Sequence, residues 1–383
     1  MATARSGLSS DHPCTTLMTG ATGLLGHLVL RELLIRGHRI VAVLRSPLGE
    51  TAGRLRGILQ KFGTDLSPFI DQRQLILVEG ELPGNLPEPE WGRTHSILNC
   101  AASLRLFANG DGEPFETNVS GTKALIEWAI RHNVTRIHAV STAYTCGWNS
   151  GVIYEEFHTP APEFQTDYEK SKWKAEALLE QWASWLGHSL TLFRPSFLVG
   201  DSTTGYTTQF GGFYQFARLV SALKKRFADP NNGESTLIPL RIPGRPEDRQ
   251  NIVPVDFCSR LIAEVVSDPR FHGRIYHLTN PEPPTNAMMK CCYEEYFGLH
   301  GGYFANPEEV IGKCTSAESL LWDKYHLITP RIVHNPLFDT TNTRAVMEAA
   351  GLTFPTLNRE RIFRLFDYAS RRGWGRQYDR LRE

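Results

Sequence analysis

Short apolar runs alternate with helical stretches from Thr15 to Asn280. Most of the runs are nearly continuous in apolar residues, as in strands that are buried on both faces of a parallel sheet. The predicted strands are Thr15 to Thr19, Arg39 to Leu44, Leu75 to Val78, Ser96 to Asn99, Arg136 to Val140, Ser189 to Phe193 and Arg274 to Thr279. Stretches between them, such as Glu116 to His132 and Tyr168 to Trp185, carry apolar residues at helical spacing. The alternation predicts an α/β fold with a doubly wound parallel sheet.

A glycine-rich segment, Thr19 to Gly26, lies between the first apolar run and the first helical stretch. Glycines permit the positive φ angles of a tight turn, and they let a pyrophosphate approach backbone N–H groups at a helix N-terminus. This placement favours dinucleotide binding in a Rossmann fold over an ordinary glycine-containing loop. The residues expected at the cofactor are Thr19, Gly20, Thr22, Gly23, Leu24, Leu25 and Gly26.

The pattern changes after Gly200, where Thr, Gly, Pro and aromatic residues replace the regular alternation. Loops and small inserted elements are predicted there, and the segment 251–256 leads into a helix that returns the chain to the last strand. We expect a Rossmann core over 14–200, completed by about 250–280, with a smaller, mainly helical lid that binds substrate over 201–249 and 281–383. Residues 1–13 are polar and predict a disordered lead-in, not a signal peptide.

Composition narrows the class of partner. The 383 residues include 41 basic and 41 acidic side chains, which argues against nucleic acid or an anionic membrane as the main partner. No apolar run is long enough for a transmembrane segment. The seven cysteines are odd in number and show no C-x-x-C spacing, which favours a reducing cytoplasm. The thirteen histidines lack ligand spacing, so no metal is predicted.

The end of the second predicted strand carries Arg45 and Ser46 where a carboxylate would bind the adenosine ribose of NAD. An arginine pairs instead with the 2′-phosphate of NADP, helped by Ser46 and Arg54, unless Arg45 is only a surface side chain. The ends of the next two strands predict weaker cofactor contacts, at Glu81, Leu82, Ala101 and Ala102.

Tyr168 and Lys172 are four residues apart, so both lie on one face of a predicted helix. A neighbouring ammonium favours the phenolate and lowers the pKa of a tyrosine, and it can also hold the nicotinamide ribose. A solvated Tyr–Lys pair is the alternative. Thr142 ends a strand one loop earlier and could hold a carbonyl oxygen that Tyr168 protonates, with Ser141 as the other candidate because the register is open.

With these motifs in order, the chain resembles the extended branch of the short-chain dehydrogenase/reductase superfamily from about Cys14 to Asn280. The resemblance implies Thr142, five residues before Gly147, as the catalytic hydroxyl beside Tyr168 and Lys172. It implies Asn118 as a residue that braces the site. The motifs that carry it are the glycine turn, Asn99 to Ala102, Asn118 to Thr122, Ser141 to Gly147, Tyr168 with Lys172, Arg194-Pro195 and Val253 to Asp256. Pro195 and Phe197 are expected along the cofactor.

Within that branch, the glycine turn, the basic end of the second strand, Arg54 to Arg56 and the segment 194–202 are similar to the thioester reductase and fatty acyl reductase group. This likeness implies NADPH as the hydride donor. It implies an acyl thioester on coenzyme A or a carrier protein as the substrate, reduced to an aldehyde or alcohol. Because the chain has no adenylation or carrier domain, we expect the thioester to arrive in trans.

Five further side chains are candidates for the substrate. Ser141 and Tyr144 flank the catalytic threonine, and Arg249, seven residues before Asp256, could bind a phosphate or form a salt bridge on a loop. The aromatic cluster after Gly200 could line an acyl pocket, although core packing is the more common role of such a cluster. Its members are Phe210, Phe213, Tyr214 and Phe216, of which Phe210 and Phe213 are the substrate candidates.

Other activities use the same side chains. An NADP-dependent ketone or aldehyde reductase, or a secondary-alcohol dehydrogenase on a small molecule, needs the same threonine, tyrosine and lysine. A dehydratase is disfavoured because Ala143 and Tyr144 stand where its acid-base pair would be, and Arg45 argues against an NAD-retaining epimerase. A sensor that binds NADP without turnover would not need Tyr168 and Lys172. The oligomeric state stays open, a homodimer included.

Overall fold

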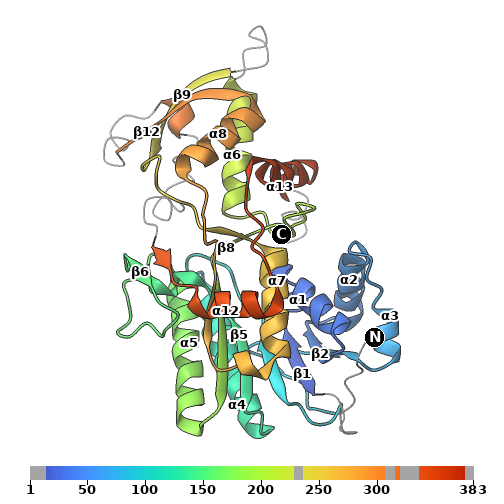
Figure 1. Cartoon of the computed structure of the whole chain (residues 1–383). Coiled ribbons are helices and arrows are strands. Elements are labelled where there is room, and N and C mark those ends of the chain that lie inside the picture. The colour runs from blue at the N-terminus through green and yellow to red at the C-terminus, as the bar shows by residue number, and fades with distance from the viewer. Residues whose placement is uncertain (1–13, 228–235, 307–314, 320–335, 376–383) are drawn as a thin grey trace, which may run out of the picture.

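The computed structural model describes residues 14–227, 236–306, 315–319 and 336–375. Its centre is a parallel sheet of seven strands, which confirms the predicted doubly wound Rossmann fold (Figure 1). The strand order across the sheet is β3 (Leu75–Glu79), β2 (Arg39–Leu44), β1 (Thr15–Thr19), β4 (Ser96–Asn99), β5 (Arg136–Val140), β7 (Ser189–Pro195) and β11 (Ile275–Leu278). The expected lead-in over residues 1–13 lies outside the described residues.

Alternation along β1 explains why both faces of the sheet are covered. Met18 packs with helices α1 (Leu24–Ile35) and α7 (Val255–Ser267), whereas its neighbour Leu17 packs with α4 (Gly121–Arg131) and α5 (Asp167–Leu186) on the other face. Both side chains are fully buried. Two separate apolar cores therefore meet on one strand, as the period of two along a strand requires.

Further helices complete the first of these faces. Each contributes apolar side chains to the core around Met18. They are α2 (Leu48–Gln60), α3 (Ser67–Asp71) and α12 (Thr341–Ala350). Because β1 and β4 are neighbours whose following helices α1 and α4 lie on opposite faces, the strand ends between them form the crevice where open α/β sheets bind ligands.

A second, smaller lobe stands above the carboxyl ends of the strands (Figure 1). It has its own apolar core. Among the elements that contribute side chains to it are α6 (Phe213–Phe227), β9 (Thr236–Pro243), α8 (Asn286–Phe297), β12 (Leu299–Ala305) and α13 (Arg359–Arg371). The parallel pair of β9 and β12 was not expected, because two prolines and two glycines hide the alternation of these strands.

Short elements connect the two parts. The strand β8 (Phe197–Val199) pairs with β10 (Ile252–Pro254), and β6 (Val152–Ile153) pairs with β13 (Leu337–Phe338). The described chain also contains one turn of π-helix, η1, and three short 3-10 helices, η2 to η4, and residues 316–319 are helical. The bounds of η1 to η4 are Glu116–Ser120, Ala143–Cys146, Pro269–Phe271 and Gly373–Gly375.

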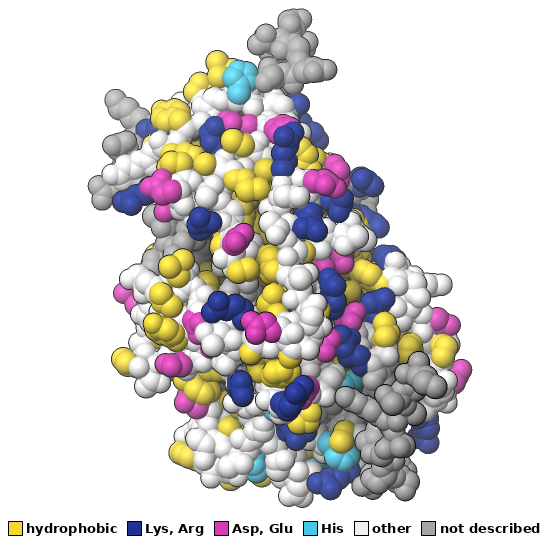
Figure 2. Space-filling view, in the orientation of Figure 1, with side chains coloured by type: hydrophobic (Ala, Val, Ile, Leu, Met, Phe, Trp, Pro, Cys, Tyr) yellow, Lys and Arg dark blue, Asp and Glu magenta, His cyan; other side chains and the backbone are white. Residues whose placement is uncertain are grey.

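The visible surface shows no segregation of charge. Lys and Arg side chains lie beside Asp and Glu side chains over both parts of the molecule (Figure 2). Among the described residues, no helix is both long and apolar enough to cross a membrane, and no three His, Cys, Asp or Glu side chains gather as a metal site would need.

Candidate active site

The glycine turn joins β1 to α1 at the crevice between β1 and β4. Gly20 has φ of 72°, and a Cβ there would lie 2.5 Å from the backbone nitrogen of Ala101. A Cβ on Gly26 would lie 2.0 Å from the carbonyl oxygen of Gly20. Close packing of backbone against backbone therefore requires glycine at both positions. This is the cradle that a dinucleotide pyrophosphate needs, so the residues present fit the expected cofactor.

Helix α1 presents its N-terminus to the same crevice. No side chain caps it at Gly23, and its first turn holds no acidic residue. Leu24 and Leu25 have buried side chains, so only their backbone N–H groups are placed to bind an anion, while Thr22 is half-buried beside them. The helix end therefore has donors and a favourable dipole for a phosphate.

Asn99 and His27 support the turn, and neither was among the predicted cofactor residues. The Oδ1 of Asn99 accepts hydrogen bonds from the Thr19 hydroxyl (2.6 Å) and the Ala101 nitrogen (3.2 Å). The Nδ1 of His27 lies 2.7 Å from the Gly23 carbonyl oxygen, and burial lowers the pKa of His27 to about 4. Two signals in the sequence could have indicated these roles: Asn99 is a polar residue in a buried strand, and His27 directly follows the last glycine of the turn.

The basic residues expected at the adenosine end are all exposed. Arg45 and Ser46 directly follow β2, and Arg54 lies on α2 close enough to His27 to lower its pKa. Glu79, at the end of β3, accepts a hydrogen bond from the Leu48 nitrogen (3.1 Å) at the start of α2.

The remaining residues expected near the adenosine differ in their exposure to solvent. Glu81 and Ala102 are exposed, and Ala101 is half-buried beside Gly20. Leu82 packs against the core and the start of α4 near Gly121. The structure thus places Ala101 at the glycine turn and Leu82 against the start of α4.

Thr142, Tyr168 and Lys172 meet where β5 ends. The Thr142 side chain accepts a hydrogen bond from the Tyr144 nitrogen (3.3 Å) at the start of η2, and it shares a hydrogen bond with the Tyr168 hydroxyl. Tyr168 is the second residue of α5, and Lys172 follows one turn later. The Lys172 Nζ donates to the Val140 carbonyl oxygen (2.8 Å).

The neighbouring Ser141 faces a different environment. Its Oγ is buried and has no hydrogen-bond partner among the described residues. Thr142, by contrast, lies against Tyr168 and within 3.4 Å of the Pro195 carbonyl oxygen. The register along the strand therefore sets Thr142, not Ser141, beside the tyrosine.

The electrostatics of Tyr168 differ from the expectation. Burial raises the pKa of Tyr168, the Glu169 carboxylate adds to the rise, and the Thr142 hydrogen bond opposes it. The predicted lowering by Lys172 was wrong for this structure because the ammonium donates to Val140 and desolvation of the phenol dominates. At neutral pH the phenol is protonated, as a proton donor must be.

Asn118 lies in η1 and connects three segments. Its Nδ2 donates to the Ser103 carbonyl oxygen (3.0 Å) and the Ser171 Oγ (2.9 Å), while its Oδ1 accepts from the Ser103 nitrogen (2.9 Å). The same loop touches α5 again, because the Leu106 carbonyl oxygen accepts from the Tyr168 nitrogen (3.2 Å). Asn118 therefore fixes the loop after β4 against the helix that carries Tyr168.

The candidate substrate residues are spread over both lobes. The Tyr144 ring lies 4.9 Å from the Phe197 ring, just above Thr142. Phe210 lies against Tyr214 (5.9 Å).

Two of these candidates lie elsewhere. Phe213 is buried in the core of the upper lobe, stacked on Phe366 (5.4 Å), which fits packing and not substrate contact. Arg249 is exposed and donates to the Pro283 carbonyl oxygen (2.9 Å), so the structure shows no salt bridge for it among the described residues.

We expect dinucleotide affinity to fall as the pH rises through about 8. Burial lowers the pKa of Lys172 to about 8, while Glu176 and Cys100 oppose this shift, so the ammonium that would hold a ribose hydroxyl loses its proton there. The measurement is the Kd for cofactor from about pH 7 to about pH 9.5. A flat profile would contradict the role of Lys172.

The effect of the same group on stability has the opposite sign. Because the folded pKa of Lys172 is below the ordinary 10.5, the unfolded chain binds more protons between about pH 8 and that value. Its contribution to the free energy of unfolding therefore rises with pH in this window. Urea unfolding at each pH separates this gain in stability from the loss of affinity.

Comparison with known proteins shows the family to which this chain belongs. The family model described as male sterility protein, an NAD-binding domain, matches residues 18–262, more than half of the chain. A non-canonical nonribosomal peptide synthetase, FrzA, of Cladobotryum sp. is 23% identical over 93% of the chain and 36% of its own length. The aldehyde reductase lnbA of Aspergillus flavus is 26% identical over 89% of the chain and 33% of its own length.

Solved structures show the same fold. The terminal R domain from the myxalamid PKS-NRPS biosynthetic pathway has a TM-score of 0.74 and 23% identity, over 96% of this chain and 92% of that one. The chain spans about a third of the length of the two curated relatives. From the matched family and the fold, the chain belongs to the male sterility protein family, within the extended short-chain dehydrogenases/reductases.

Proposed function

We propose that the protein is an NADPH-dependent reductase that acts on an acyl thioester carried by coenzyme A or a carrier protein. The observation that carries this proposal is the meeting of Thr142, Tyr168 and Lys172 at the end of β5, next to a glycine turn whose shape fits a pyrophosphate. Two relatives of the chain, a peptide synthetase and an aldehyde reductase, support reduction of an acyl or aldehyde carbonyl.

Each side chain has one task in this proposal. NADPH held by the glycine turn would supply a hydride for the carbonyl carbon. The hydroxyls of Thr142 and Tyr168 donate hydrogen bonds to the carbonyl oxygen, and Tyr168 transfers its proton as negative charge develops there. Lys172 holds the ribose, while Asn118 keeps the loop after β4 against α5. With a thioester, the resulting hemithioacetal loses the thiol and leaves an aldehyde.

The test is a panel of compounds with NADPH. Acyl thioesters of coenzyme A, of pantetheine and of a carrier protein are compared with free aldehydes and ketones, and NADPH oxidation and products are followed. Oxidation with thioesters, giving aldehyde or alcohol, supports the proposal. Activity with free aldehydes or ketones alone points to the second candidate, a carbonyl reductase, which the aldehyde reductase lnbA favours. Binding of NADPH without any turnover contradicts both.

For cofactor choice, we expect Arg45→Asp to weaken NADPH at least tenfold and to leave NADH within about threefold. A charge-assisted hydrogen bond to the 2′-phosphate contributes about 1.5–3 kcal/mol, which only NADPH can lose. The measurement is the Kd of each cofactor. Arg56→Asp is the matched control, since Arg56 is also exposed, carries the same charge and lies on α2 near Asp65. Equal losses for the two cofactors would count against the phosphate role of Arg45.

A further inference from the structure

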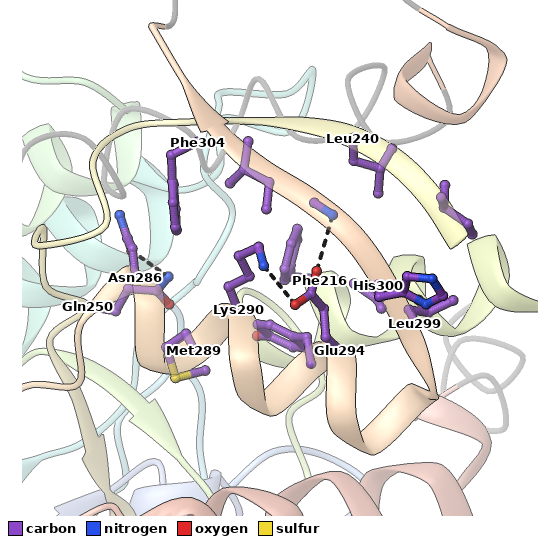
Figure 3. Close-up of a pocket in the computed structure, with 15 residues that line it drawn as sticks. Phe216, Leu240, Gln250, Asn286, Met289, Lys290, Glu294, Leu299, His300 and Phe304 are labelled. Carbon is purple, nitrogen blue, oxygen red and sulfur yellow. Dashed lines mark hydrogen bonds and ion pairs between the residues drawn. The ribbon is translucent and has the colours of Figure 1, made fainter. Parts of the chain in front are cut away.

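A pocket lies in the upper lobe, between α6, α8 and the arch of β9 and β12 (Figure 3). Its cavity measures about 70 Å³. Since one water-sized group needs roughly 10–15 Å³ of such space, the pocket accommodates about five to seven groups of that size. Much of the wall is apolar, with Phe216, Val220, Leu240, Met289 and Phe304 among the residues that line it.

The charged groups in the wall neutralise one another. The Glu294 carboxylate accepts from the Lys290 Nζ (2.7 Å) through one oxygen and from the Gly302 nitrogen (3.1 Å) through the other. Figure 3 shows both bonds on one side of the pocket. An ionic ligand would have to compete with this pair, whereas a neutral apolar group gains from the rest of the wall.

One end of the pocket is linked to the candidate active site. Gln250, whose Nε2 donates to the Asn286 Oδ1 (2.9 Å), forms this end. The next residue, Asn251, accepts a hydrogen bond from the Phe197 nitrogen (3.2 Å).

The Phe197 side chain continues this link toward the reacting groups. Its ring lies 4.9 Å from the Tyr144 ring, and the Tyr144 nitrogen donates to Thr142 (3.3 Å). Three successive contacts, and the peptide bond between Asn251 and Gln250, thus connect Thr142 to the pocket.

We propose that this pocket receives the neutral, apolar end of the acyl group whose carbonyl is held by Thr142 and Tyr168. The inference rests on the proposed function and specifies its substrate: an acyl group long enough to reach past Phe197, ending in an alkyl or aromatic segment of about six carbons. Burial of each methylene raises affinity about threefold to fourfold, so selectivity increases with chain length until the pocket is full.

The test replaces a residue of β9 with a larger side chain that fills the pocket. Leu240 lines the pocket, whereas Leu237, on the same strand, is 59% exposed and does not. Leu240→Trp is expected to lower kcat/KM at least tenfold for long acyl thioesters and to leave the acetyl thioester within about twofold. Leu237→Trp is the matched control and should change neither. Val220→Phe fills the same space from α6 if Leu240→Trp does not fold.

A binding measurement separates this inference from the proposed function. Unreactive acyl pantetheine amides, acetyl to dodecanoyl, are titrated by calorimetry into wild type and Leu240→Trp with NADPH present. Affinity that rises with chain length in wild type only supports the pocket even if no thioester is reduced. Turnover or binding with the same chain-length profile in both proteins overturns the pocket and leaves the proposed function standing.

Discussion

Tyr168→Phe is expected to lower kcat/KM for carbonyl reduction by about a hundredfold to ten-thousandfold, the usual contribution of a general acid. The substitution removes the phenolic proton and the hydrogen bond to Thr142 but keeps the ring. Because the pKa of Tyr168 is raised, the phenol of the wild-type protein is fully protonated at neutral pH. The variant therefore loses a proton donor that is present in every wild-type molecule. Steady-state NADPH oxidation with the best substrate of the panel gives the measurement.

Two controls make this result specific to the reacting proton. Tyr154→Phe makes the same chemical change at a side chain that is 58% exposed, and it should leave activity unchanged. The Kd for NADPH of Tyr168→Phe should stay within about threefold of wild type, since Lys172 and the glycine turn remain. Undiminished turnover in Tyr168→Phe would remove the tyrosine from the mechanism.

Gly26→Ala is expected to abolish measurable NADPH binding and to lower the free energy of unfolding by about 1–3 kcal/mol or more. A Cβ at this buried position in α1 would lie 2.0 Å from the Gly20 carbonyl oxygen and 2.9 Å from the Gly20 carbonyl carbon. The two backbone segments must separate, which deforms the cradle around the pyrophosphate. Urea unfolding and cofactor titration measure the two effects.

Gly53→Ala provides the matched helix substitution. Gly53 lies inside α2 with open space where its Cβ would be, so alanine should raise the free energy of unfolding by about 0.5–1 kcal/mol through helix propensity. Opposite signs for the two variants would show that backbone contact, not glycine's flexibility, is decisive at Gly26. Normal NADPH binding by Gly26→Ala would contradict the role of the turn.

The central sheet was predictable because most of its strands are short runs of apolar residues. Residues 15–19, 39–44, 96–99 and 136–140 are strands with the predicted bounds, since each is a short apolar run with clear boundaries. The strands of the upper lobe were missed because Pro239 and Pro243 interrupt one and Gly301 and Gly302 the other. Their pairing brings together segments about 60 residues apart, which local pattern cannot reveal.

The sequence brought Tyr168 and Lys172 together, but it did not reveal the electrostatics of the candidate site or the supporting roles of Asn99 and His27. Spacing alone put Tyr168 and Lys172 on one helix face, but the direction of the Tyr168 pKa depends on burial, which no spacing reports. The strand pattern alone left Ser141 and Thr142 as alternatives, the resemblance favoured Thr142, and the structure places Thr142 beside Tyr168. Phe216 lines the pocket, whereas Phe213, one turn earlier on the same face of α6, is buried against Phe366, and spacing alone does not distinguish the two.

The pairing of β11 with β7 has a consequence for biosynthesis. Ile275 lies beside Leu192, yet much of the upper lobe, including α6 and β9, is encoded between them. On the ribosome, the edge position beside β7 therefore stays unfilled until all of this intervening chain has emerged. The first six strands can assemble earlier, with an open edge beside β7 that is prone to wrong pairing. Completion of the nucleotide-binding sheet thus waits for the first part of the upper lobe, while α8, β12 and α13 emerge after β11.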